Sequence, residues 1–249
     1  ELLISKDQVE LSTSICKVDL ISDLVGEFPE LQGIMGGYFA LEQGFDKEIA
    51  LAVSEHYLPA GLDSKTPKKP FSVALALTDK IDTLVGFFGI NQKPTSSKDP
   101  YALRRSALGV IKLLIDNNKE FKIKDLISYS TSLHIDQGFE ISNDLLQKEL
   151  AEFLMDRLKY YLKEKKIRND IIEASMSSYM SSYGIDHMNK IYKKASTLNH
   201  FIMKEVGEDI IASYKRASNI LESELKNRDL KLSNTTDPGI FKNDYEKNL

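Results

Sequence analysis

The chain lacks the residues and segments that mark several classes of protein. Its 249 residues contain one cysteine, Cys16, and no tryptophan. A single cysteine excludes an internal disulfide framework and a metal site built from several cysteines, so we expect a reducing, cytoplasmic setting. No segment approaches the ~18 consecutive apolar residues of a membrane span, and residues 1–5 lack the basic and apolar regions of a secretory signal. We therefore expect no membrane partner.

The residues that nucleophilic catalysis needs are also missing. No G-x-S-x-G motif is present, and Cys16 has no histidine near it in the sequence. The four histidines are isolated along the chain, at positions 56, 134, 187 and 200. We therefore predict no catalytic residue. The chain begins with Glu1 rather than methionine, which favours a processed chain or a piece of a longer protein.

Positive charge is scarce at the start of the chain. Residues 1–60 carry 3 lysines and arginines against 11 aspartates and glutamates, a net charge of −8, whereas residues 61–150 and 151–249 each carry +2. The overall net charge of −4 gives little support for nucleic-acid binding, which needs clustered lysine and arginine. Such binding must therefore rest on local basic patches.

What the chain has in abundance is apolar residues with helical period, which predicts an all-α fold. From Leu103 they recur three and four residues apart, the spacing of an amphipathic helix. Asp99 suits the N-cap of this helix and Pro100 its first position. Asn117 and Asn118 are predicted to end it.

Further helices and a domain boundary follow from the same patterns. One helix is predicted from the spacing of Leu150, Leu154, Leu158 and Leu162, and others over residues 185–203 and 210–225. The short apolar run Val73–Leu77 flows into spacing of three and four, so it is also predicted as helix. Residues 117–149 have short elements and a turn, so we place a boundary near residue 140, between domains of residues 1–140 and 141–249.

Two groups of carboxylates are candidate metal or proton-transfer sites. The first group shares one helix face if the helix extends far enough: Asp19, Asp23, Glu27 and Glu30. Pro29 is expected to stop that helix near Phe28, and a solvated surface is the alternative interpretation. Asp79 and Asp82 are neighbours at i, i+3 on a helix. They either ligate Mg²⁺ or share a proton, or they join a polar network between helices.

The segment Gln32–Tyr38 contains three glycines, which let backbones approach closely. No strand precedes the segment, so neither a Rossmann nor a Walker phosphate-binding loop is predicted. Close helix packing or a tight turn is the favoured interpretation.

Two basic regions are candidate nucleic-acid contacts. Lys98, Arg104 and Arg105 flank a predicted helix N-terminus, which attracts phosphate, and Tyr101 is available to stack on a base. The alternative, equally open, is that the arginines pair with the acidic residues 1–60. In the second half, basic residues alternate with tyrosines: Lys159, Lys163, Lys165, Lys166, Arg168, Lys190, Lys193, Lys194, Lys215 and Arg216, with Tyr160, Tyr161, Tyr192 and Tyr214. This pattern suits phosphate neutralisation with stacking, although any solvated helix alternates charges in a similar way.

Long motifs of the chain resemble the beta subunit of the bacterial two-subunit glycyl-tRNA synthetase. They lie at 17–36 (KVDLISDLVGEFPELQGIMG), 55–59 (EHYLP), 74–82, 88–90, 98–105, 107–109, 156–158, 161–162, 167–170 and 214–221. The resemblance covers nearly all of the chain in order. It implies that the chain is a fragment that lacks the subunit's N-terminal portion and extreme C-terminus.

The resemblance implies a degenerate HD-type helical domain over residues 1–140. Over residues 141–249 it implies a helical anticodon-binding-like domain of the kind shared with arginyl-tRNA synthetase. It also implies a tetramer of two alpha and two beta chains, in which alpha activates glycine with ATP and Mg while beta binds the tRNA for glycine. No cofactor is expected on this chain. The predicted tRNA contacts are Lys98, Arg104 and Arg105 in the first domain and Lys215, Arg216 and Asn219 in the second.

The chain departs from the family pattern at several positions. Gly37 and Ala60 stand where basic residues are common, which weakens any expectation that residues 33–60 bind phosphate. Asn91 and Ser96 stand where glycines are common.

The HD motif is itself incomplete, because Val18-Asp19 lies where an HD enzyme has its His-Asp doublet. Asp19 and Asp79 are then relics of a metal site, and no hydrolase activity is predicted. Two alternatives remain: a metal-dependent HD phosphohydrolase acting on a nucleotide, and a structural scaffold for the alpha subunit.

Overall fold

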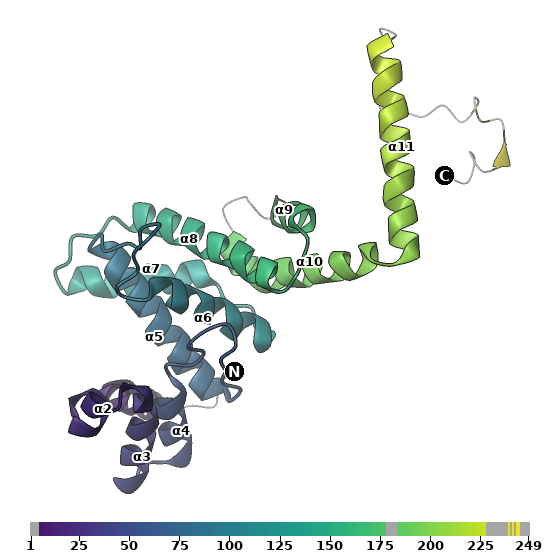
Figure 1. Cartoon of the computed structure of the whole chain (residues 1–249). Coiled ribbons are helices and arrows are strands. Elements are labelled where there is room, and N and C mark those ends of the chain that lie inside the picture. Colours follow the sequence, from purple (N-terminus) through teal and green to yellow (C-terminus); the bar gives the residue numbers. More distant parts are fainter. Residues whose placement is uncertain (1–4, 178–183, 228–238, 240, 242, 245–249) are drawn as a thin grey trace. The chain divides into compact units, whose positions relative to one another are not determined.

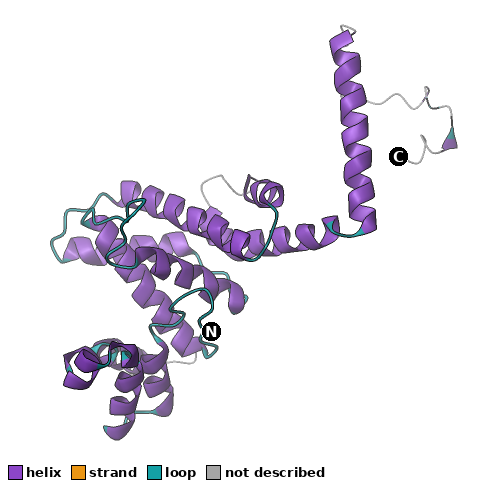
Figure 2. Cartoon of the chain, in the orientation of Figure 1, coloured by secondary structure: helices purple, strands orange, loops and turns teal. Residues whose placement is uncertain are grey.

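A computed structural model of the chain describes residues 5–177, 184–227, 239, 241, 243 and 244 (Figure 1). Within these residues the regular structure is helical and contains no strand (Figure 2). The predicted all-α class is therefore confirmed. The HD-type assignment of the first domain stays a prediction.

The first part of the chain forms short helices followed by two longer ones. In order these are α1 Lys6–Ile15, the 3₁₀ helix η1 Val18–Ile21, α2 Asp23–Glu27, η2 Pro29–Leu31, α3 Ile34–Glu42, α4 Lys47–Glu55, α5 Pro70–Gly89 and α6 Leu103–Asp116. The elements that follow are α7 Ile123–Asp136, α8 Asn143–Glu164, α9 Asn169–Ser177, η3 Gly184–His187, α10 Met188–Ile202 and α11 Glu205–Asn227.

The chain forms two compact units, Glu1–Asn199 and His200–Leu249. The boundary expected near residue 140 falls inside the first unit, between α7 and α8, and these two helices pack on each other. The assignment of separate roles to residues 1–140 and 141–249 stays a prediction.

Helix α5 is the element around which the first unit is assembled, because it contacts α4, α6, α7 and α8. Its buried side chains extend from Phe71 to Phe88, along almost the whole helix. The four leucines predicted to line α8 are at most 1% exposed, which confirms that helix and its buried face. Each fully buried leucine contributes ~1.5–3 kcal/mol to stability, so this packing fixes the elements that carry the candidate site.

The start of α6 differs from the prediction. The helix begins at Leu103, Ala102 adopts a left-handed conformation with a φ of 54°, and Pro100 lies outside the helix. The N-cap residue is Ala102 rather than Asp99, but the carboxylate oxygens of Asp99 accept the backbone N–H groups of Leu103 and Arg104 at 2.8 and 3.0 Å. The predicted end of the helix at Asn117 is confirmed.

The last two predicted helices are present with shifted ends. Residues 184–187 form the 3₁₀ turn η3 ahead of α10, and the helix expected over residues 210–225 is part of the longer α11. The apolar stripe predicted for that helix is uncovered within its unit: Ile210, Tyr214 and Ile220 are 54–72% exposed.

The predicted acidic helix face does not form. Ser22 accepts a hydrogen bond from the N–H of Val25 and so starts α2 as a separate short helix, and Pro29 starts η2. Asp19 is completely buried, and its Oδ2 accepts the N–H groups of Gly33 and Gly36 at 2.6 and 3.2 Å. The other three carboxylates of the predicted face are exposed, as in the solvated alternative.

The glycine segment packs α3 closely against α4, as predicted. A Cβ placed on Gly37 would lie 2.6 Å from the Cβ of Ser54 and 2.8 Å from the carbonyl oxygen of Ala50. Gly33 has a positive φ of 81° and lies at the start of α3. These glycines therefore set the spacing between the two helices.

We predict that Gly37→Ala lowers the free energy of unfolding by about 1–3 kcal/mol, because α3 must move away from α4 to admit the methyl group. Unfolding in urea measures the change. Gly26→Ala is the matched control, since a Cβ there meets no atom within 4 Å, and it should be neutral or stabilising by up to about 1 kcal/mol. Equal stabilities of the two variants would contradict the close packing.

Candidate nucleic-acid interface

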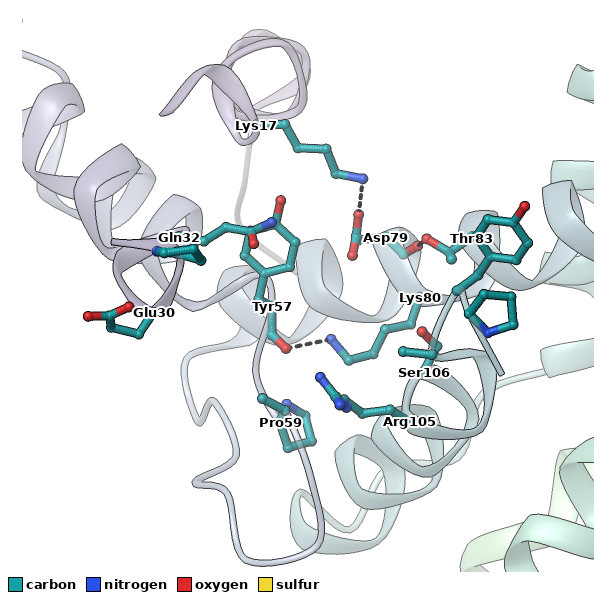
Figure 3. Close-up of a pocket in the computed structure, with 15 residues that line it drawn as sticks. Lys17, Glu30, Gln32, Tyr57, Pro59, Asp79, Lys80, Thr83, Arg105 and Ser106 are labelled. Atoms are coloured by element: carbon teal, nitrogen blue, oxygen red, sulfur yellow. Dashed lines mark hydrogen bonds and ion pairs between the residues drawn. The ribbon is translucent and has the colours of Figure 1, made fainter. Parts of the chain in front are cut away.

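A pocket of about 650 Å³ opens beside the middle of α5. Its lining comes from Lys17 between α1 and η1, from η2, from the segment after α4, from α5 and from the start of α6 (Figure 3). Five charged residues line it: Lys17, Lys80 and Arg105, with Glu30 and Asp79. The pocket therefore gathers side chains that are far apart in the sequence.

Lys17 and Asp79 form an ion pair in this pocket, with 2.6 Å between Nζ and Oδ1. Burial favours the neutral amine of Lys17, but the hydrogen bond and the charge of Asp79 outweigh it and raise the pKa of Lys17. The ammonium group of Lys17 is therefore offset by the carboxylate that it contacts.

Lys80 is buried, with 5% of its surface exposed. Its ammonium group donates to the carbonyl oxygens of His56 and Tyr57 at 3.2 and 3.1 Å. The side chain reaches them by passing Gly109 of α6, where a Cβ would lie 2.5 Å from Lys80 Cε. The carbonyl groups are neutral, so burial lowers the pKa of Lys80 to about 8.

Arg105 is exposed and lines the pocket, and its side chain extends toward the segment that carries Tyr57 and Pro59 in Figure 3. The guanidinium group of Arg104 donates to the carbonyl oxygen of Thr95, and Lys98 is exposed. Across the described residues, neither arginine pairs with a carboxylate. The predicted alternative, in which they neutralise the acidic residues 1–60, is therefore wrong for the described part of that segment.

The predicted phosphate site at the N-terminus of α6 needs a correction. Free N–H groups at a helix N-terminus attract phosphate, and two of those at the start of α6, from Leu103 and Arg104, already bind the carboxylate of Asp99. Tyr101 is stacked on Phe87, with ring centroids 4.1 Å apart, so one of its faces is covered. Any attraction for phosphate here must come from side-chain charge.

Asp79 and Asp82 do not act as a pair. Asp82 Oδ1 accepts the hydroxyl of Ser130 at 2.9 Å and lies 3.2 Å from Nε2 of His134, whereas Asp79 binds Lys17. The polar network between helices, here α5 and α7, is the interpretation that the structure supports.

The two relic candidates have other partners. Asp19 binds backbone N–H groups of the α3 segment, and Asp79 binds Lys17. In the ranges that the structure describes, no three histidine, cysteine, aspartate or glutamate side chains gather where they could hold a metal ion.

Comparison with known proteins identifies the family. A family model for the glycyl-tRNA synthetase beta subunit matches residues 1–177. The chain belongs to this family. The glycine--tRNA ligase beta subunit of Cereibacter sphaeroides is 40% identical over 98% of the chain, and that of Rickettsia canadensis is 37% identical over 98% of it. The beta subunit of Rhodospirillum centenum is 41% identical over 88% of the chain.

The chain spans about a third of the length of these beta subunits, 35, 34 and 30% respectively. The family relationship confirms the resemblance drawn from the motifs. None of the helices in the described ranges combines the length and the apolar character needed to cross a membrane.

Several basic residues in the second half of this beta-subunit chain already have partners. The ion pairs are Lys159 with Glu173, Arg168 with Asp170 and Lys190 with Glu120. Tyr161 is buried, and Lys165 lies over its ring at 5.3 Å. This part of the predicted basic pattern therefore includes internal contacts as well as exposed charge.

The residues predicted on α11 are exposed. Lys215, Arg216 and Asn219 all lie on the surface of the second unit. Lys215 and Asn219 share one helix face, because residues four apart are neighbours on a helix. Tyr214 beside them is 72% exposed.

Three charged or aromatic residues of the pocket were not predicted as site residues: Lys17, Tyr57 and Lys80. A signal for Lys80 is present in the sequence, since it lies between Leu77 and Leu84 on the apolar stripe of α5, where a lysine is unusual unless it finds partners. Lys17 and Tyr57 join it through the tertiary fold, which no local pattern reports.

The buried charge of Lys80 makes stability depend on pH. Its pKa is about 8 in the folded chain and 10.5 ordinarily, so the unfolded state binds more protons between these values and the free energy of unfolding rises with pH. We predict that the chain gains about 2 kcal/mol relative to its Lys80→Met variant between about pH 7.5 and about pH 9.5. Urea unfolding at each pH measures this, and a constant difference would show that Lys80 titrates as it does in water.

Proposed function

We propose that this chain supplies part of the tRNA-binding surface of the beta subunit of glycine-tRNA ligase. It thereby supports the ATP-dependent attachment of glycine to its tRNA. In this proposal the alpha subunit performs the chemistry with ATP and Mg, in a tetramer of two alpha and two beta chains, and this chain contributes no catalytic residue. The support is the family and the charged surface described above.

The observation that carries the proposal is the positive charge at the start of α6, whose arginines form no ion pair with a carboxylate among the residues that the structure describes. Arg105 opens on the pocket, Arg104 donates to a carbonyl oxygen, and Lys98 is exposed. Cations that lack a carboxylate partner have no internal ion pair to break before they bind phosphates and release counterions from RNA. The net negative charge of the whole chain does not change the local positive charge at the start of α6.

A second observation supports an RNA contact on α11. Lys215 and Arg216 are exposed beside Tyr214, and basic residues next to an exposed aromatic ring suit phosphate neutralisation with base stacking. Asn219 adds an amide that can both donate and accept.

We predict that replacing Arg104 and Arg105 together by alanine weakens tRNA binding by the assembled ligase and flattens its salt dependence. Each lost phosphate contact reduces the slope of log K against log salt by ~0.7–0.9, so we expect a reduction of about 1.5 in a filter-binding titration across salt concentrations.

The matched control for this pair is Arg168→Ala, because Arg168 is half-exposed but already bound to Asp170. Its slope should equal that of the wild type. An unchanged slope in the double variant would remove both arginines from the tRNA interface. Loss of alpha-subunit binding with intact tRNA binding would instead favour the scaffold alternative.

For α11 we predict that the charged residues and the amide of Asn219 have different effects on tRNA binding and on its salt dependence. Lys215→Ala with Arg216→Ala should reduce the salt slope by about 1.5, as above. Asn219→Ala should weaken binding of the tRNA for glycine while leaving the slope unchanged, since an amide neutralises no phosphate. Titrations with this tRNA and a non-cognate tRNA measure both effects, and a changed slope in Asn219→Ala would contradict this assignment.

A further inference from the structure

The lining of the pocket beside α5 has more cations than carboxylates, with Lys17, Lys80 and Arg105 against Glu30 and Asp79. Of its charged residues, Lys17 and Asp79 offset each other at 2.6 Å. Glu30 is exposed. Among the described residues, no carboxylate lies within ion-pair distance of Lys80 or Arg105. The pocket therefore favours an anion.

Lys80 and Arg105 have N–H donors that could bind a phosphate group. An ammonium group has three N–H donors, and the carbonyl oxygens of His56 and Tyr57 accept two of those of Lys80. The guanidinium of Arg105 presents a planar fork that matches two phosphate oxygens. In Figure 3 the side chains of Arg105 and Lys80 both extend from their helices toward the segment that carries Tyr57 and Pro59. A phosphate group there would offset the buried charge of Lys80.

The remaining walls suit a flat ring. Tyr57 and Tyr101 both line the pocket, and each is held in place by a second ring. Tyr57 lies against His56 with centroids 3.8 Å apart, and Tyr101 lies against Phe87 at 4.1 Å. The volume of about 650 Å³ is within the ~300–1,000 Å³ typical of small-molecule sites, which exceeds the needs of a lone phosphate ion.

We propose that this pocket binds a nucleoside monophosphate unit, with the phosphate at Arg105 and Lys80 and the base against a tyrosine wall. The unit comes either from an unpaired nucleotide of RNA or from a free nucleotide. The first source rests on the proposed function, and the second does not.

Calorimetric titration of the chain with AMP, adenosine and inorganic phosphate tests the pocket. AMP should bind more tightly than adenosine or phosphate. Arg105→Ala should weaken AMP binding at least about tenfold, the effect of losing a charged hydrogen-bonding group, and leave adenosine binding unchanged. Arg105→Lys should recover part of the loss, because it keeps the charge without the fork.

Arg168→Ala is the control variant for the pocket, because Arg168 does not line it and is bound to Asp170. It should change AMP binding by less than about twofold, well under the effect of a lost charged contact. Absence of AMP binding, or equal effects of the two alanine variants, would overturn the inference.

Competition separates the two sources. If AMP weakens tRNA binding by the assembled ligase, the pocket takes a nucleotide of RNA; if the two bind independently, it takes a free nucleotide, and both results uphold the pocket. A salt slope flattened in the Arg104 and Arg105 double variant without AMP binding would overturn the pocket and keep the proposed function. AMP binding with an unchanged salt slope in the double variant would keep the pocket and overturn the proposed tRNA contact of the two arginines.

Discussion

A buried lysine of α5 contacts α6 and the segment after α4, which form part of the candidate site. Lys80 leaves α5, passes Gly109 of α6 and donates to the carbonyl oxygens at the end of α4. A buried charge costs several kcal/mol unless it is hydrogen-bonded, so the packing of α5 on α6 and the path of the chain after α4 depend on each other. A Cβ at position 109 would lie 2.5 Å from Lys80 Cε, so the lysine side chain would have to leave its present path past α6.

The helices that could be predicted from the sequence are those whose packing follows a regular period. The stripe from Leu150 to Leu162 is buried along α8, and α5 continues the short run Val73–Leu77 as expected. The segment around Asp19 could not be predicted from charge spacing, because Ser22 caps one short helix and Pro29 starts another. These local capping interactions determine the backbone conformation of the segment, and the carboxylate of Asp19 binds N–H groups at the start of α3.

The site was predictable only where its residues are neighbours in the sequence. Arg104 and Arg105 stand out as a pair next to a helix start, whereas Lys17, Tyr57 and Lys80 come from three separate segments and meet through packing. At the start of α6, the sequence pattern predicted both a capping carboxylate and a phosphate site. Asp99 was expected as the N-cap residue of α6, and that position is instead taken by Ala102. The carboxylate of Asp99 still occupies N–H groups that a phosphate would need, so its binding there and anion binding exclude each other.

The charge balance of the chain shows why formal counts mislead about binding. Residues 1–60 carry a net charge of −8, yet this acidity does not neutralise the arginines of α6. Asp19 is turned inward to backbone donors, and exposed charges interact weakly beyond a Debye length of ~8–10 Å. What decides whether an arginine can bind phosphate is whether a carboxylate lies within about 4 Å of it, the range of an ion pair. Arg105 has no such neighbour among the described residues, and an acidic chain can therefore keep a locally cationic pocket.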